Sequence, residues 1–236
     1  MLEVRLYRGQ DGEGALQSYS VPRRESQTVL DVVTTIQREI DPALAYRFAC
    51  RVGMCGSCAM MVNGVPRWTC RTHVDLVAKD GKLTLEPLRS LPHIRDLVAD
   101  MVPFFDKMQA AGGRFIPLEK VPETLLPIDP ASTGRQEADA AIECIGCGVC
   151  YAACDVVAWK PDYVGPAALN RVWSLVNDER DGDRSGHLST ALEAGGCLSC
   201  HGIGSCAAHC PNALNPTRSI AGLKRSGFRV ALGGKL

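Results

Sequence analysis

Twelve cysteines in three short groups are the residues of this chain whose type and spacing indicate chemistry. The groups span residues 50–70, 144–154 and 197–210. Thiolates are soft ligands, and closely spaced thiolates hold zinc or iron–sulfur clusters. A disulfide scaffold is the alternative, but such scaffolds are typical of short secreted chains, whereas this sequence has 236 residues and no visible secretion signal. We therefore expect the cysteines to bind metal.

The first group places three cysteines in one loop and a fourth behind a hairpin. The loop spacing is four and then two residues, which is typical of plant-type [2Fe–2S] sites. Gly53 and Gly56 would let backbone N–H groups approach the sulfur atoms. Structural zinc is the alternative, but zinc usually takes two close cysteine pairs. The predicted [2Fe–2S] ligands are Cys50, Cys55, Cys58 and Cys70.

The other two groups contain related runs, CIGCGVCYAAC and CHGIGSCAAHCP, and the second run has Ile203 where the first has a cysteine. In two-cluster ferredoxins the last cysteine of each run ligates the other cluster. Under that rule the predicted [4Fe–4S] ligands are Cys144, Cys147, Cys150 and Cys210. The predicted ligands of the third site are Cys154, Cys200 and Cys206. With Ile203 at the missing corner, three thiolates predict a [3Fe–4S] cluster, whose altered charge we expect to raise its potential.

Cys197, three residues before Cys200, leaves two interpretations open. It is either a buried thiol without a role in metal binding, or a fourth ligand that turns the third cluster into a cube.

The hydrophobic pattern predicts a small mixed sheet before the first connector. Residues 2–9, 18–22 and 83–88 are expected to be strands, and residues 29–40 have apolar side chains at helical spacing. Asn63-Gly64 between two apolar runs predicts a hairpin that returns Cys70 to the loop.

The rest of the chain has mainly helical patterns. We expect a helix over residues 92–108, followed by a Gly- and Pro-rich connector over about 111–134 that contains Pro117, Pro122, Pro127 and Pro130. A later helix, PAALNRVWSLVNDERD, presents an apolar face with Leu169, Val172, Trp173 and Val176. The last helix is expected to begin with Asn215 as its N-cap and Pro216 at its first position.

Charge and hydropathy exclude several classes of function. The 26 basic and 26 acidic residues balance, which gives no reason to expect a nucleic-acid partner. No stretch approaches the ~18 consecutive apolar residues of a membrane span. No targeting pattern is visible at the start, so we expect the bacterial cytoplasm as compartment.

Taken in order, these motifs resemble a known family. A plant-type motif is followed by LPHIRDLVAD, CIGCGVCYAAC, WKPDYVGPAALNR and CHGIGSCAAHCPNALNPTRSI. The sequence resembles the iron–sulfur subunit of succinate dehydrogenase and fumarate reductase (complex II). The resemblance implies an α+β chain, with an N-terminal β-grasp plant-type ferredoxin domain over residues 1–105. An all-α, bacterial-ferredoxin-like helical domain with the other two clusters would follow over residues 106–236.

The resemblance also implies partners and a location. A flavoprotein subunit would hold covalent FAD and the dicarboxylate site, and membrane anchor subunits would complete a quinone site. FAD, and any heme, would belong to those partners. The chain would lie peripherally on the cytoplasmic face of the bacterial inner membrane.

Two residues match positions that contact quinone in the family, Trp159 and His201. The sequence departs from the family pattern beside them, because Asp155 and Val156 stand where proline and serine are frequent. Asp155 has two interpretations, a proton donor to reduced quinone or a solvated loop acid.

The leading hypothesis is an electron-transfer subunit of a succinate:quinone or quinol:fumarate oxidoreductase, which relays electrons between FAD and quinone. No catalytic triad, phosphate loop or isolated acid pair is evident, so we expect no chemistry on succinate by this chain alone. Two alternatives remain: a soluble electron carrier for a different flavoprotein, and a zinc-organised scaffold.

Overall fold

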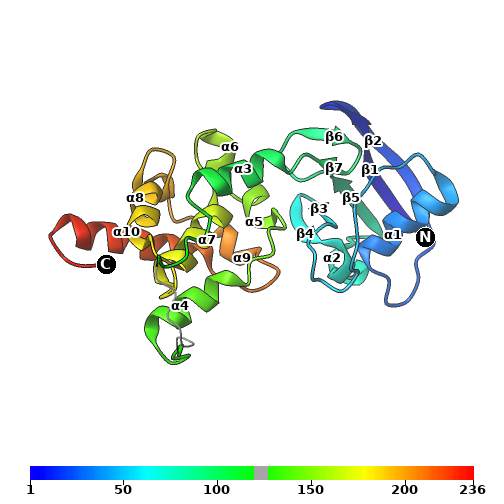
Figure 1. Ribbon diagram of the computed structural model, residues 1–236. Helices are drawn as coiled ribbons and strands as arrows, with labels where there is room; N and C mark the ends of the chain where they lie inside the picture. Colours follow the sequence, from blue (N-terminus) through cyan, green and yellow to red (C-terminus); the bar gives the residue numbers. More distant parts are fainter. Residues whose placement is uncertain (120–126) are drawn as a thin grey trace. The chain divides into compact units, whose positions relative to one another are not determined.

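The computed structural model describes residues 1–119 and 127–236, which fall into two compact units (Figure 1). The sheet unit comprises Met1–Pro103 together with Ile145–Ala153, and the helical unit comprises Phe104–Cys144 together with Cys154–Leu236. The chain is therefore a mixed α/β protein with an N-terminal sheet and a helical remainder, as the sequence predicts at this coarse level.

The sheet unit is built on one seven-stranded sheet. Its strands are β1 (Leu2–Gln10), β2 (Glu13–Val21), β3 (Ala59–Val62), β4 (Val65–Trp68), β5 (Lys82–Glu86), β6 (His93–Arg95) and β7 (Val98–Ala99). The order is β4-β3-β5-β1-β6-β7, with β2 paired to β1. β5 runs parallel to β1, whereas the β1–β2 and β3–β4 pairs are antiparallel. The expected strands at 2–9 and 83–88 are confirmed, and β2 begins earlier than the predicted residue 18.

One helix supplies most of the apolar residues that cover this sheet. α1 (Val29–Thr35) continues as a π-helical turn, η1 (Ile36–Ile40), within the predicted range 29–40. A capping box between Thr28 and Asp31 begins the helix, because each side chain satisfies a backbone N–H that has no helical partner. The helix buries its valines against Val4, Leu83 and Leu85. Three short helices complete this unit: η2 (Thr69–Arg71), α2 (Val74–Val77) and α5 (Val149–Ala152).

The predicted helix over 92–108 is wrong in its first half. Residues 93–99 form β6 and β7, and α3 begins only at Val102 and ends at Ala110. The buried carboxylate of Asp96 explains the difference, because it binds Arg8 and accepts backbone N–H groups from Gly9 and Ala45. These bonds hold Asp96 in a left-handed turn, with φ of 49°, that a helix could not contain.

The helical unit gathers around one long buried helix, α7. Besides α3, its helices are α4 (Thr133–Ile142), α6 (Asp155–Trp159), α7 (Pro166–Asn177), α8 (Arg184–Leu192), η3 (Cys197–Ser199), α9 (Ser205–Ala208) and α10 (Pro216–Ala231). The predicted apolar face of α7 is buried, as expected. α10 begins at the predicted cap, with the Asn215 side chain accepting the backbone N–H of Arg218 and Pro216 at the first position.

α7 and α10 approach each other closely at Gly222. A Cβ atom at that position would lie 2.6 Å from the indole ring of Trp173, so only glycine fits. Beside this contact, the buried amide of Asn170 donates to the Ala141 carbonyl of α4 and accepts the Ser219 hydroxyl of α10. These bonds join α4, α7 and α10 through satisfied polar groups.

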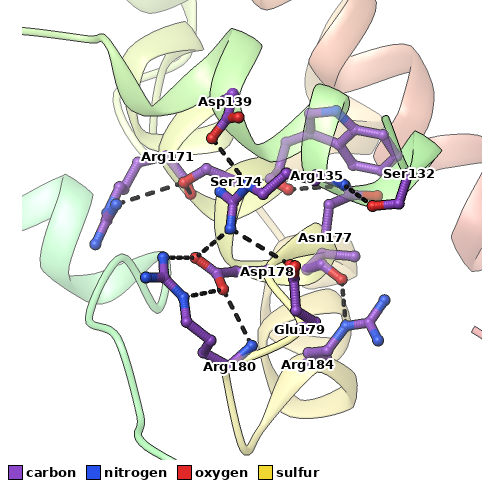
Figure 2. Close-up of polar contacts among 12 residues, drawn as sticks. Ser132, Arg135, Asp139, Arg171, Ser174, Asn177, Asp178, Glu179, Arg180 and Arg184 are labelled. Atoms are coloured by element: carbon purple, nitrogen blue, oxygen red, sulfur yellow. Dashed lines mark hydrogen bonds and ion pairs between the residues drawn. The ribbon is translucent and has the colours of Figure 1, made fainter. Parts of the chain in front are cut away.

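A cluster of charges at the end of α7 adds to this packing (Figure 2). The guanidinium of Arg135, almost fully buried, lies 2.9 Å from Asp139, 3.4 Å from Asp178 and 3.4 Å from Glu179. Arg180 binds the same Asp178 through two nitrogen atoms, at 2.7 and 2.9 Å. These hydrogen bonds from Arg180, together with nearby positive charge, lower the pKa of Asp178 to about 2.

The predicted connector over 111–134 is described in part. Gly182 donates to the Ile116 carbonyl, and Pro117 forms a β-bridge with Asp181. Pro122 lies outside the described residues. Over residues 1–119 and 127–236, no helix is both long enough and apolar enough to span a bilayer.

Candidate metal centres

Backbone N–H groups of the loop 50–58 point at its own sulfur atoms. The Cys50 Sγ accepts from the N–H groups of Met54 at 3.2 Å and Cys55 at 3.3 Å, with Val52 at 3.5 Å. Arg51, Gly53 and Gly56 all have left-handed backbone angles, with φ of 59°, 77° and 69°. This winding turns successive amides inward, which is the arrangement that stabilises negative sulfur.

The β3–β4 hairpin brings the distant cysteine back, as the Asn63-Gly64 pair predicts. Cys58 precedes β3 and Cys70 lies in η2 just after β4, and the Thr69 hydroxyl donates to the Cys58 carbonyl at 2.8 Å. Cys58 and Cys70 are buried, whereas Cys50 and Cys55 are partly exposed. The four predicted ligands of the first site therefore lie on one loop and the hairpin beside it.

Electrostatics differ across this first site. The Ser57 hydroxyl and the Cys50 backbone N–H lower the pKa of Cys55 to about 6, which favours the thiolate. Burial, and then the neighbouring Cys58, raise the pKa of Cys70 to about 11. Within the described residues, the buried indole N–H of Trp68 has no hydrogen-bond partner. Trp68 packs with Cys58 and Cys70, so a donor is free beside these thiols, which fits a site for sulfide and thiolate.

The second cysteine run is divided between the two units. Cys147 and Cys150 belong to the sheet unit, whereas Cys144 and Cys210 belong to the helical unit. Within the sheet unit, a Cβ atom on Gly56 would lie 2.5 Å from the Cβ of Cys147. The backbone of the first loop at Gly56 therefore packs directly against the Cys147 side chain. Within the helical unit, the Asn212 side chain donates to the Glu143 carbonyl at 3.0 Å, which links the segments of Cys210 and Cys144.

The third predicted site is a cavity inside the helical unit. Cys154, Cys200 and Cys206 line the same cavity, together with Ile203 and Tyr163. The cysteines come from three segments, at the N-terminus of α6, after η3 and within α9. Ile203 lies between two glycines with left-handed φ of 71° and 85°, and its side chain lines the cavity while remaining 52% exposed.

Burial dominates the electrostatics of this third cavity. It raises the pKa of Cys154 and of Cys206, and the pKa of Tyr163 is raised by burial and then by the charge of the nearby thiols. Backbone N–H groups of Val156 and Val157 donate to Cys154 and oppose this rise in its pKa. The Gly202 N–H donates to the Cys200 Sγ at 3.4 Å. These donors fit a set of thiolates that bind metal as anions.

A site for a single metal ion is not found among the described residues. In the described parts of the chain, no three His, Cys, Asp or Glu side chains converge on a position for one metal ion.

Comparison with known proteins matches both units of the chain. A family model described as a 2Fe-2S iron–sulfur cluster binding domain matches residues 1–106, and a 4Fe-4S dicluster domain matches residues 143–215. The fumarate reductase iron–sulfur subunit of Haemophilus influenzae is 32% identical, over 89% of this chain and 85% of that protein. The corresponding Mycobacterium tuberculosis subunit is 33% identical, over 98% of this chain and 94% of that protein.

A succinate dehydrogenase subunit is equally similar. The iron–sulfur subunit from Paracoccus denitrificans is 33% identical, over 83% of this chain and 74% of that protein. Among solved structures, the apo Mycobacterium smegmatis Sdh1 complex contains a chain that superimposes with a TM-score of 0.87 at 27% identity, over 95% of this chain and 94% of that one.

The chain belongs to the family of iron–sulfur subunits of succinate dehydrogenase and fumarate reductase. It is thus an electron-transfer component of an oxidoreductase complex, as the motif order predicts.

Within this iron–sulfur subunit, the two residues predicted to contact quinone lie on adjoining segments. Trp159, the last residue of α6, is 67% exposed. His201 follows Cys200, is exposed and lines the third cavity, as does Asp155. Lys160 donates to the Ser199 hydroxyl at 3.0 Å, which ties the segment of Trp159 to that of His201. Their role toward quinone stays a prediction.

Cys197 lies in a different environment from the three cavity cysteines. It is fully buried in η3, does not line the third cavity, and burial raises the pKa of its thiol. These facts favour an apolar packing role.

Two residues at the third site were missed in the sequence. Tyr163 is buried against Cys200, and the Thr217 hydroxyl lies 3.3 Å from the Cys206 Sγ. The signal for Thr217 was present, since the Asn215-Pro216 helix start places its side chain in the first turn of α10. Nothing in the one-dimensional pattern indicates that this turn faces α9.

Proposed function

We propose that this chain relays electrons between the FAD of a flavoprotein subunit and a quinone bound at membrane anchor subunits, through three iron–sulfur clusters. The proposed [2Fe–2S] ligands are Cys50, Cys55, Cys58 and Cys70, and the proposed [4Fe–4S] ligands are Cys144, Cys147, Cys150 and Cys210. The proposed [3Fe–4S] ligands are Cys154, Cys200 and Cys206. When bound, such clusters supply one-electron carriers.

The observation that carries this proposal is the third cavity. Three thiols from three segments line it, and an apolar side chain, Ile203, occupies the position of the fourth ligand. A structural zinc site would need four donors, and a second cube would need a fourth thiolate, whereas the remaining cysteine of this group, Cys197, does not line the cavity. A three-iron cluster is the type of centre that fits three thiolates and a corner without a ligand.

The ligand exchange between the two cysteine runs has support of its own. Cys154 lines the cavity with Cys200 and Cys206 and belongs to the helical unit, while Cys150 of the same run belongs to the sheet unit. The hydrogen bond from Asn212 to Glu143 joins the segment of Cys210 to that of Cys144. Both observations favour an arrangement in which each run gives its last cysteine to the other cluster, over one in which each run binds a cluster alone.

The chain's own residues prepare these sites in three ways. The loop 50–58 directs its amides at sulfur, which lowers the cost of anionic thiolates. The cavity residues Tyr163 and Val156 are buried and give the third set of thiols an apolar lining on one side. Trp159 and His201 present an exposed apolar and polar pair that would contact quinone.

The domain assignment follows from the same proposal. We assign a β-grasp plant-type ferredoxin domain to residues 1–105 and a bacterial-ferredoxin-like helical domain to residues 106–236. The partners would be the FAD-containing flavoprotein, which would bind succinate or fumarate, and one or more anchor subunits. The complex would lie on the cytoplasmic face of the bacterial inner membrane.

Low-temperature EPR on the anaerobically purified complex tests the proposal. We expect a near-isotropic signal in the oxidised complex that disappears on mild reduction, as a three-iron cluster gives. Cys206→Ala should abolish this signal and leave the reduced [2Fe–2S] signal intact. Two cubes on reduction, with no oxidised-state signal, would contradict the third cluster, and a chain purified without anchors or quinone reductase activity would favour a soluble carrier.

A further inference from the structure

Thr217 lies where the last helix meets the third cavity. It is the second residue of α10, after the Asn215 cap and Pro216. Its side chain lines the cavity, and its Oγ1 is 3.3 Å from the Sγ of Cys206. Both residues belong to the helical unit, so this contact does not depend on how the two units are arranged.

The chemistry of the metal-bound state fixes the direction of this hydrogen bond. In a free thiol, either the hydroxyl or the sulfur could donate. A cysteine that binds iron does so as the thiolate and has no proton to give. The Thr217 hydroxyl must then be the donor, and over the described residues no second partner competes for it.

Thr217 differs from the other donors at this site because a substitution can remove it cleanly. Cys154 and Cys200 receive backbone N–H groups, from Val156, Val157 and Gly202, which only a proline substitution would delete, and proline would also disturb the backbone. Tyr163 also interacts with Cys200, but it is a large buried side chain whose loss would disturb packing. Threonine and valine have nearly the same shape, so the hydroxyl alone can be tested at residue 217.

We propose that Thr217 is a positioning residue that raises the midpoint potential of the third cluster by donating a hydrogen bond to the Cys206 thiolate. The proposal rests on the cluster assignment given under the proposed function. Reduction adds one electron, and hence one negative charge, to a centre already ligated by three thiolates. A donor aimed at a ligand sulfur stabilises the reduced state more than the oxidised state, and the potential rises.

The position of Thr217 on a long helix supports this role. α10 has 16 residues, and Gly222 and Leu223 hold it against the core of the helical unit. The cap and the proline fix the backbone of the first turn, and β-branching restricts χ1 of Thr217, so the hydroxyl has little freedom to turn away from Cys206. A donor held in advance costs little reorganisation when charge arrives at the sulfur.

The test is a redox titration of the intact complex. The oxidised-state EPR signal of the third cluster is measured at each potential. Wild type, Thr217→Val and Thr217→Ser are compared, and the reduced [2Fe–2S] signal serves as an internal control. We expect Thr217→Val to lower the midpoint potential of the third cluster, and Thr217→Ser to restore most of the difference. The midpoint of the first cluster should be the same in all three complexes.

The possible failures are distinguishable. A wild-type signal whose midpoint is unchanged in Thr217→Val overturns the role of Thr217 and leaves the cluster assignment standing. Equal shifts in the valine and serine variants also overturn it, because they indicate packing and not the hydroxyl. A wild-type complex without an oxidised-state signal overturns the cluster assignment and the role of Thr217 together. If Thr217→Val loses the cluster, Thr217→Ala and Thr217→Ser form the comparison, with the same expected order.

Discussion

The first and third sites hold their thiols by opposite means. At the first site, three of the four cysteines lie within the nine residues 50–58, and amides of the same loop point at the sulfur atoms. At the third site, the thiols come from three separate segments, at the start of α6, after η3 and within α9, which line one cavity. The first site is thus largely encoded locally, whereas the third is a product of tertiary packing. Loss of the first cluster should therefore follow from changes in its own loop, and loss of the third from changes in the packing of the helical unit.

The largest effect should come from crowding the first loop. Gly56→Val would place a branched side chain at a left-handed position, with its Cβ 2.5 Å from that of Cys147. The backbone strain costs roughly 1–2 kcal/mol and the overpacking about 1–3 kcal/mol more. We expect loss of the [2Fe–2S] signal, measured by EPR and by the iron content of the complex.

Gly64→Val is the matched control for this substitution. Gly64 also has a left-handed φ, 76°, but a Cβ atom added there would meet no atom within 4 Å. The variant should keep the cluster, and its free energy of unfolding should fall only by the backbone strain, about 1–2 kcal/mol. Equal cluster loss in both variants would mean that strain, and not the contact with Cys147, controls the first site.

The next effect changes the kind of cluster at the third site. Ile203→Cys supplies a thiolate at the missing position of the run, where the side chain already lines the cavity. Four thiolates favour a cube, so the oxidised EPR signal should disappear and a reduced-state signal should replace it. Ile203→Val, which adds no ligand, should leave the cluster type unchanged. A persistent three-iron signal in the cysteine variant would show that the residue 203 loop points away from the corner.

A smaller effect should come from Asp178→Asn, which should lower the temperature at which the third cluster is lost more than that of the first. Asp178→Asn removes the shared partner of Arg135 and Arg180 (Figure 2), and breaking a buried charge pair costs roughly 3 kcal/mol. Because this damage lies in the helical unit, the third cluster should be lost at a lower temperature than in wild type. The [2Fe–2S] signal should persist to nearly the wild-type temperature. Thermal loss of each EPR signal is the measurement.

The lowered pKa of Asp178 predicts how the stability difference between wild type and Asp178→Asn depends on pH. Its folded value of about 2 lies below the ordinary value of about 3.9, so the wild-type carboxylate stabilises the fold fully above about pH 4. That contribution disappears as the pH falls through the range between the two values. The stability difference between wild type and Asp178→Asn should hence be constant from about pH 6 to 8. A difference that varies across this range would implicate another group.

The smallest effect is expected at Cys197. Its thiol is fully buried and does not line the third cavity, so Cys197→Ser should leave every EPR signal unchanged. Burying a hydroxyl in place of a thiol should cost about 1 kcal/mol of stability, seen as a small fall in melting temperature. A changed third-cluster spectrum would make Cys197 a ligand and would reverse the assignment of that site.

How far the sequence could predict each site follows from the same contrast. Asn63-Gly64 predicts the hairpin because a two-residue turn depends on the local backbone alone, and the cap of α10 is visible in Asn215-Pro216 for the same reason. The segment 92–101 was misassigned because its decisive contact, the buried carboxylate of Asp96, joins residues far apart in the chain. Thr217 was missed for a related reason, since its partner Cys206 lies on another helix.

The exchange of segments between the two units has a consequence for how the protein is made. Residues 145–153 belong to the sheet unit, and Val149 packs beside Cys58 and Trp68 there. A nascent chain emerging from the ribosome cannot complete that unit when residue 103 appears, although N-terminal domains usually fold first. About fifty further residues must be synthesised before its last segment, which ends at Ala153, is complete. The sheet unit therefore cannot finish folding until part of the second cysteine run has been synthesised.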